Sequence, residues 1–292
     1  MAGNRDRPED PVPAHADRQD VPADKDKTWF AALKRAYTEA GRDNAGIVAA
    51  GVAYYAFLAI VPLLAAMVMG YGLFADPETV ARHAQALAGT LPSDAAKLIN
   101  GQLESAAEAA TGAKGFGLVV ALAVALFSAR GGANALIEAL NIAYDITDNR
   151  SFVRRNLLAL GMTGGAVIGL VIVVGAVTAT SMLDGFAGRA ASLAASFAAA
   201  VIGATVVYRF APHRDAPRIA LQLPGAVFFG VAIVSLTALF GFYVANFGSY
   251  NATYGSLGAV VVLLTWLYLA AYALLLGAEL NAPSEYTVSR RA

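Results

Sequence analysis

Five polar side chains recur at helical spacing in residues 128–146, SARGGANALIEALNIAYDI. Steps of four, four, three and four residues place them on one face of a helix; they are Arg130, Asn134, Glu138, Asn141 and Asp145. Such a face predicts the polar lining of a pathway for a solute or ion at a membrane surface. The alternative is the solvated face of a helix that has left the membrane.

Glu279 is the second candidate, because it stands at the end of a long apolar run, LLLGAELN. Acidic residues inside membrane segments are rare and usually have a partner. Glu279 either reaches water at the end of its helix or pairs with Arg130 or Arg154. A structural role and a functional role both fit this position.

Pro62 and several tyrosines complete the pathway candidates. Pro62 interrupts an apolar segment, where it removes a backbone hydrogen bond and kinks the helix. Transporters use such breaks to expose carbonyls near midplane sites, and a simple structural kink is the alternative. Tyr54 and Tyr55 precede Pro62, and we expect at least one of them to face protein or a wet cavity, since lipid would leave its hydroxyl unpaired. Tyr250 and Tyr254 lie in a charge-free stretch, residues 246–256, that directly precedes the last apolar run.

The sequence favours no catalytic chemistry. Its three histidines, His15, His83 and His213, fall in separate segments, and there is no cysteine. Motifs for zinc hydrolysis, a nucleophilic serine or nucleotide phosphates do not occur. We therefore expect no enzyme, no metal site and no cofactor.

The composition predicts an all-α polytopic membrane protein. The chain is 58% hydrophobic and only 14% charged, against about 25% charged in soluble domains. Six segments are long enough to cross about 30 Å of hydrocarbon: residues 46–74, 116–146, 157–180, 189–208, 221–245 and 257–280. The second has only 14 apolar residues before Arg130, so we expect one long helix whose cytoplasmic half leaves the bilayer, with Arg130 extending towards the interface.

The basic residues predict the orientation. With alternate connections on alternate sides, 17 of the 21 Lys and Arg residues fall on one side and four on the other. The positive-inside rule then places both termini in the cytoplasm with an even number of spans. The basic loops are explained by this topology and by attraction to anionic lipid, so we expect no nucleic-acid partner.

We expect three parts along the chain. Residues 1–28 are polar and proline-rich and predict a disordered cytoplasmic tail. Residues 29–283 form the six-span membrane domain, in which residues 29–43 make an amphipathic helix that either lies on the membrane surface or caps the loops. Residues 75–115 predict an outer loop with two short helices, and residues 284–292 a second cytoplasmic tail.

Small residues recur every four positions in the third and fourth spans. Gly161, Gly165 and Gly169 form one row, and Ala195, Ala199 and Gly203 continue another. Such rows let helix backbones approach closely in lipid. Packing within the chain is the plain interpretation; the alternative is a homo-oligomer (homodimer) contact or a sliding surface for transport.

Three segments resemble the YihY/BrkB family of bacterial inner-membrane proteins: residues 49–64 (AAGVAYYAFLAIVPLL), 128–146 and 254–281 (YGSLGAVVVLLTWLYLAAYALLLGAELN). The resemblance covers residues 28–283 and implies six spans in the cytoplasmic membrane. The family carries two inherited labels, a virulence factor and a ribonuclease (ribonuclease BN). This chain has none of the acid or histidine clusters that metal-dependent RNA cleavage needs, which argues against the second label.

Two functions therefore stay open from the sequence. The first is a transporter, exporter or channel-like protein for a small solute or ion, built around the pathway candidates above. The second is a non-transporting envelope or virulence-associated protein that acts as a scaffold or handles lipid. A membrane-bound hydrolase would need a clustered nucleophile or acid set that the sequence does not offer.

Overall fold

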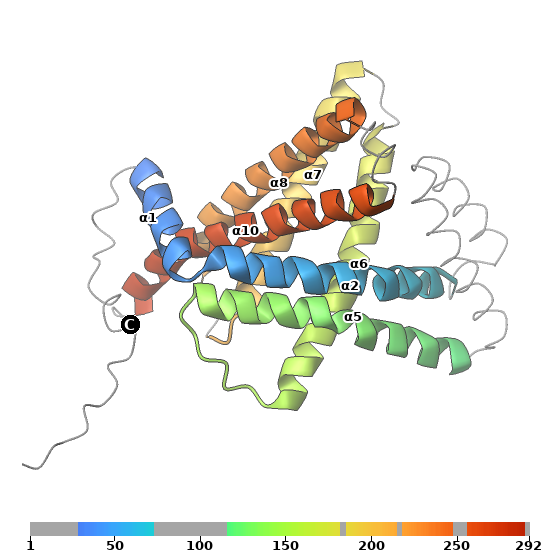
Figure 1. Cartoon of the computed structure of the whole chain (residues 1–292), viewed down its shortest axis with the longest axis horizontal. Coiled ribbons are helices and arrows are strands. Elements are labelled where there is room, and N and C mark those ends of the chain that lie inside the picture. Colours follow the sequence, from blue (N-terminus) through green and yellow to red (C-terminus); the bar gives the residue numbers. More distant parts are fainter. Residues whose placement is uncertain (1–28, 73–115, 182–184, 215–217, 248–255, 290–292) are drawn as a thin grey trace, which may run out of the picture.

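The computed structural model describes residues 29–72, 116–181, 185–214, 218–247 and 256–289, and all regular structure in these ranges is helical (Figure 1). The predicted tail 1–28, the loop 75–115, Tyr250 and Tyr254 lie outside the described residues. The helices are α1 (Trp29–Arg42), α2 (Ala45–Gly72), α5 (Phe116–Ala143), α6 (Phe152–Ser181), α7 (Gly185–Phe210), α8 (Ile219–Phe247) and α10 (Ser256–Ser289).

Consecutive helices from α2 to α10 cross at varied angles and begin and end alternately in two regions, which we call the two ends of the bundle (Figure 1). One end carries the links 144–151 and 211–214, the start of α2 and the last turns of α10. We call it the basic end, because Arg150, Arg154, Arg155, Arg209 and Arg214 lie there. At the far end α2, α6 and α8 finish and α5, α7 and α10 begin.

α5 ends in a way that decides where its polar residues lie. Asp145 has a φ of 53°, the left-handed region that Asp and Asn tolerate best among residues with a side chain. The Asp145 amide donates to the carbonyl of Ile142 and the Ile146 amide to that of Asn141, which is a Schellman motif. The prediction that the helix continues through Ile146, with Asp145 on its polar face, is therefore wrong.

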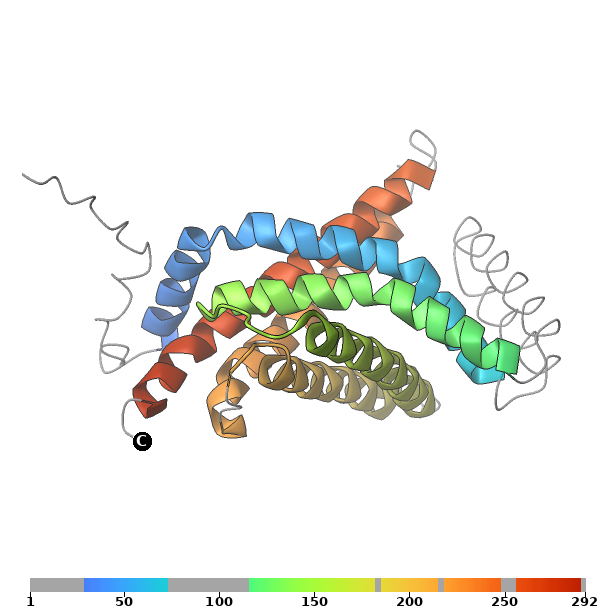
Figure 2. The same cartoon turned by 90° about the horizontal axis from the view of Figure 1, so that it is seen from below.

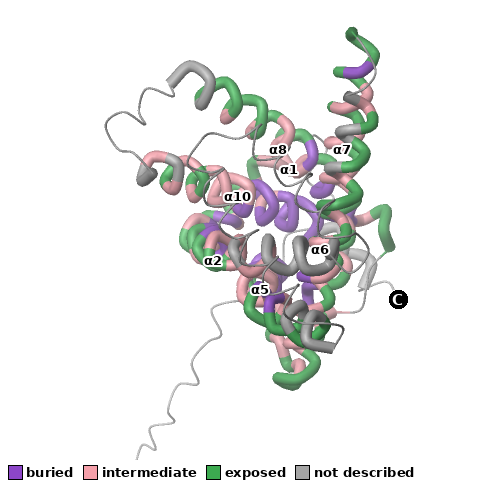
Figure 3. The backbone as a smooth tube through the Cα atoms, turned by 90° about the vertical axis from the view of Figure 1, so that its right-hand side faces the viewer, coloured by how far each residue is buried: buried purple, intermediate pink, exposed green. Residues whose placement is uncertain are grey.

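The packing is dense at one end and open at the other. α2 lies along α5, α10 packs on α8 and α2, and α7 joins α8 to α6 (Figure 2). α1 is bent by 74° from α2 and rests on α10. The helices diverge towards the far end (Figure 1), and the buried residues gather where they converge, near the basic end (Figure 3).

The crossing of α8 and α10 needs two glycines. A Cβ atom on Gly225 would overlap the carbonyl oxygen of Gly277, and one on Gly277 would overlap the Tyr208 hydroxyl. The backbones therefore touch, which matches the use of small residues at helix contacts in lipid. Neither glycine belongs to the rows expected from the sequence.

The rows expected from the sequence do not make such contacts. A Cβ on Gly161, Gly165 or Gly169 of α6 would have nothing within 4 Å among the described residues, and the same holds for Gly203 of α7. Gly161, Gly165 and Gly203 are exposed. Close packing of these glycines within the chain is thus a wrong interpretation, whereas an oligomer contact stays a prediction.

The chain is a multi-pass membrane protein by the length and apolarity of its helices. Four described segments are long and apolar enough to cross a membrane: Phe152–Val173, Gly185–Phe210, Ile219–Tyr243 and Val260–Ala282. The bent pair Trp29–Arg42 and Ala45–Ile60 makes up to five if it counts as one span. Six spans with both termini in the cytoplasm stay a prediction.

Candidate functional site

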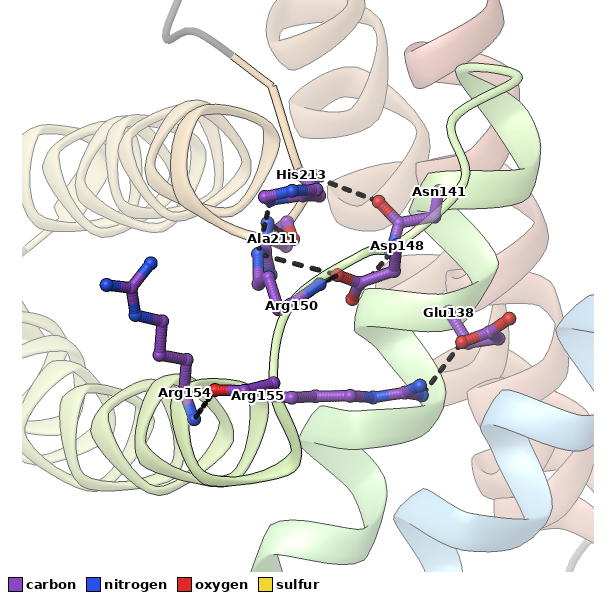
Figure 4. Close-up of polar contacts among 9 residues, drawn as sticks. Glu138, Asn141, Asp148, Arg150, Arg154, Arg155, Ala211 and His213 are labelled. Atoms are coloured by element: carbon purple, nitrogen blue, oxygen red, sulfur yellow. Dashed lines mark hydrogen bonds and ion pairs between the residues drawn. The ribbon is translucent and has the colours of Figure 1, made fainter.

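The two links at the basic end are joined by a polar network (Figure 4). Asn141 accepts from the His213 amide at 2.9 Å and donates to Asp148 at 3.3 Å. Arg150 donates to His213 Nδ1 at 3.0 Å and to the Ala211 carbonyl at 2.9 Å, and pairs with Asp148 at 3.7 Å. The network fixes the link after α5 against the link after α7.

The predicted polar face of α5 divides between two environments. Asn141 is 2% exposed and belongs to the network above. Glu138 faces solvent or headgroups, with its side chain 53% exposed, and pairs with Arg155 of α6 at 2.8 Å. The solvated-face interpretation thus fits Glu138, and a buried structural role fits Asn141.

Buried Tyr144 and Asn281 and half-buried Arg214 form a group directly behind this network. The Arg214 guanidinium carbon lies 3.8 Å from the centre of the Tyr144 ring, and Tyr144 is 3% exposed. Burial raises the pKa of Tyr144 to about 12, although Arg214 and Asn281 oppose the shift because they favour the phenolate. Tyr144 is therefore a neutral phenol at physiological pH.

Glu279 lies in the same buried region at 3% exposure. Its carboxylate acts electrostatically on Arg35 of α1 and on Tyr144. Burial lowers the pKa of Arg35, and the carboxylates of Glu39 and Glu279 oppose that shift. The expectations that Glu279 reaches water, or pairs with Arg130 or Arg154, are wrong, because α1 lies over the last turns of α10 and supplies Arg35 instead.

Two further side chains bring α7 and α8 into this region. The Tyr208 hydroxyl donates to the Leu274 carbonyl at 2.7 Å, and the Gly225 amide donates to Asn281 Oδ1 at 2.8 Å. Gln222, one turn before Gly225, is 0% exposed, and neither atom of its amide group has a hydrogen-bond partner among the described residues. We call Tyr144, Tyr208, Arg214, Gln222, Glu279 and Asn281 the polar core.

The other sequence candidates lie away from the polar core. Arg130 and Asn134 are in the middle of α5, and Pro62 is half-buried within α2, which continues past it. Tyr54 and Tyr55 are 55% and 50% exposed, with their rings edge to face at 5.5 Å. Val52 and Ala53 are the buried residues of this turn, and the expectation that at least one of the two tyrosines faces protein or a wet cavity stays a prediction.

Sequence reasoning missed most of the polar core. Tyr144, Tyr208, Arg214, Gln222 and Asn281 each stand alone in their segments, and only the fold brings them together. One available signal was Asn281, which directly follows the end assigned to the sixth span and lies two residues after Glu279. A second was the Pro224-Gly225 pair, since glycine inside an apolar helix marks close approach of another backbone.

The polar core offers groups for binding rather than for bond cleavage. It holds one carboxylate, two amides, two phenols and a guanidinium, with Arg35 beside it. Within the described part of the chain, no three His, Asp or Glu side chains are placed to hold a metal ion.

A family model described as "Virulence factor BrkB" matches residues 36–292. The chain belongs to this family. The match begins within α1 and covers α2 to α10, and it confirms the resemblance seen in the sequence.

The relatives of this BrkB family member carry two different kinds of name, one of a ribonuclease-like protein and one of a membrane protein. The ribonuclease-like protein YfkH of Bacillus subtilis is 30% identical over 187 residues, which are 57% of this chain and 64% of YfkH. UPF0761 membrane proteins of Xanthomonas campestris are 36% identical over 95 residues, 32% of this chain and 21% of theirs. The chain thus spans less than two thirds of these relatives. No solved structure matches it.

Proposed function

We propose that this BrkB family protein is a transporter or channel-like protein of the bacterial cytoplasmic membrane for a small solute or ion. In this proposal the basic end faces the cytoplasm and the polar core closes the pathway there. The observation that carries it is Glu279, an acid buried to 3% exposure near the end of an apolar helix and facing Arg35 and Tyr144. A charge in such a position is costly and typical of a transport site.

The shape of the bundle supports a closed basic end. Helices α5, α7, α8 and α10 contribute buried residues near this end. Towards the far end the same helices expose large apolar side chains, such as Val124, Leu239 and Val261. A two-state transporter needs one end of its bundle sealed while the helices at the other end separate. The hydrogen-bonded polar contacts at the sealed end can exchange partners when that end opens.

The test is flux in liposomes that contain the purified protein, over a panel of ions and small polar solutes. We expect a solute whose flux is lost in Glu279→Gln and kept in Glu138→Gln, a matched change at an exposed acid. Equal flux in wild type and Glu279→Gln would contradict the role of Glu279. Absence of flux across a broad panel would favour the second candidate.

That second candidate is a lipid-handling or scaffolding protein, and exposed apolar faces favour it. α6 exposes Ile168, Val171 and Ile172, and α7 exposes Phe186 at 87%. The name of the B. subtilis relative is not carried over, because the polar core offers a single acid where metal-dependent RNA cleavage uses clustered acids or histidines.

A further inference from the structure

One exposed face of α5 changes character halfway along the helix. Towards the far end it presents Val120, Val124 and Phe127, which are 44%, 60% and 55% exposed. Towards the basic end it presents Asn134 and then the exposed Glu138. Arg130 stands at the boundary between the apolar and the polar half, close to the middle of a 28-residue helix.

Arg130 is held against the apolar half. Its guanidinium carbon lies 3.9 Å from the centre of the Phe127 ring, a cation–π contact. Its Nε atom is buried without a hydrogen-bond partner, and no carboxylate of the described residues forms an ion pair with it. Asn134, one turn on, has a buried Oδ1 without a partner; this oxygen is an acceptor, so only the amide nitrogen of Asn134 can donate to an anion.

The position of Arg130 along α5 makes this arrangement informative. The Glu138–Arg155 pair marks a level where charges are exposed, and Arg130 lies eight residues further along α5. At 1.5 Å per residue the two positions are about 12 Å apart along the helix axis. A guanidinium beside exposed valines and a phenylalanine, with no ion-pair partner among the described residues, favours an anion as its ligand.

An anionic amphiphile fits both halves of this face. Guanidinium groups bind phosphate through paired N–H donors, and an asparagine amide adds a further donor. The exposed apolar side chains on the far side of Arg130 fit acyl chains. A free phosphate ion would satisfy the guanidinium but would leave the apolar half without a role.

We propose that Arg130 and Asn134 bind the phosphate of an anionic lipid whose acyl chain lies along Val120, Val124 and Phe127. This site is separate from the polar core, and it stands whether or not a solute crosses the membrane. Its failure and the failure of transport are therefore distinguishable, because binding is measured without flux.

The test is the thermal unfolding midpoint of the full chain in a neutral detergent, titrated with phosphatidylglycerol, phosphatidylcholine or inorganic phosphate. We expect phosphatidylglycerol to raise the midpoint more than phosphatidylcholine does. Arg130→Gln should weaken the apparent affinity for phosphatidylglycerol about tenfold or more, as loss of a charged hydrogen-bonding group does. Arg130→Lys should keep part of the affinity for phosphatidylglycerol. Arg218→Gln, which changes an exposed arginine of the basic end, should keep all of that affinity.

Three results would overturn the proposal. The first is an unchanged phosphatidylglycerol response in Arg130→Gln. The second is an equal loss in Arg218→Gln, which would mean non-specific attraction. The third is a shift by inorganic phosphate as large as that by the lipid, which would assign the site to free phosphate. If Arg130→Gln does not fold, Phe127→Ala serves instead, because it removes the aromatic support and should weaken phosphatidylglycerol binding selectively; an unchanged response would overturn the proposal.

Discussion

The basic end and the far half of α6 and α7 differ in how closely their helices pack and in which side chains are buried. At the basic end, polar groups from distant segments are buried and hydrogen-bonded, as in the Tyr208–Leu274 and Gly225–Asn281 contacts. In the far half of α6 the side chains are apolar and exposed, and the glycines meet no neighbour among the described residues.

This difference follows from the surroundings of the chain. Lipid solvates apolar side chains as well as other helices do, so apolar faces gain little from packing on each other. Buried polar groups gain much more from meeting partners, since none is available in hydrocarbon. The basic end is therefore where stability and any gate are concentrated, and three substitutions test this difference between the two regions.

Gly277→Ala should have the largest effect. Its Cβ would overlap the Tyr208 hydroxyl and lie 2.7 Å from the Gly225 carbonyl oxygen. Overpacking of this kind costs about 1–3 kcal/mol and sometimes more. The measurement is the thermal unfolding midpoint in detergent, with Gly165→Ala on open space as the matched control. A Gly277→Ala midpoint equal to that of the control would contradict the crossing described for α8 and α10.

Asn281→Leu should follow in size. It removes the buried hydrogen bond that the Gly225 amide donates to Asn281 across the crossing of α8 and α10, and such a bond contributes about 0.5–1.5 kcal/mol. Asn156→Leu is the control, because Asn156 donates only to the carbonyl of Phe152 in its own helix. We expect a clear loss of chemical-denaturation stability at Asn281 and little change at Asn156; equal losses would remove the distinction between the two regions.

Tyr144→Phe should change how stability depends on alkaline pH. The pKa of Tyr144 is raised to about 12 from an ordinary value near 10, so the folded protein holds the phenolic proton more tightly than the unfolded chain. That stabilisation is complete below pH 10 and is lost as the pH rises through 12, by about 3 kcal/mol. Unfolding midpoints across this range should fall more steeply in wild type than in Tyr144→Phe. Parallel curves would contradict the buried position of the phenol.

The fold was predictable where apolar length decides it. The long apolar runs gave helices close to the observed bounds, including α5 as one element through Arg130 and α1 as a separate helix. The residue at which α5 ends was not predictable. It depends on the left-handed backbone of Asp145 and on the Schellman hydrogen bonds, which hydrophobic periodicity does not encode.

The candidate site was predictable only in part. Glu279 was found because an acid stands out in an apolar run, whereas Arg35, on which it acts electrostatically, lies 244 residues earlier in the chain. Gln222 and Tyr208 carry no local signal that separates them from polar residues facing headgroups. The three-dimensional crossing of α7, α8 and α10 alone brings them to the polar core.

The most direct test of the central claim asks whether the polar core opens to water, and it needs no knowledge of the solute. The chain has no cysteine, so Gln222→Cys introduces a single thiol at a position with 0% exposure. Thr147→Cys in the exposed link and Ala226→Cys in the apolar core are the controls. In membrane vesicles of known orientation, a membrane-impermeant maleimide should label Thr147→Cys rapidly from the cytoplasmic side. It should label Gln222→Cys slowly but completely, and leave Ala226→Cys unmodified. If Gln222→Cys stays as inert as Ala226→Cys, from either side, the polar core is a static seal and the proposed pathway through it is contradicted.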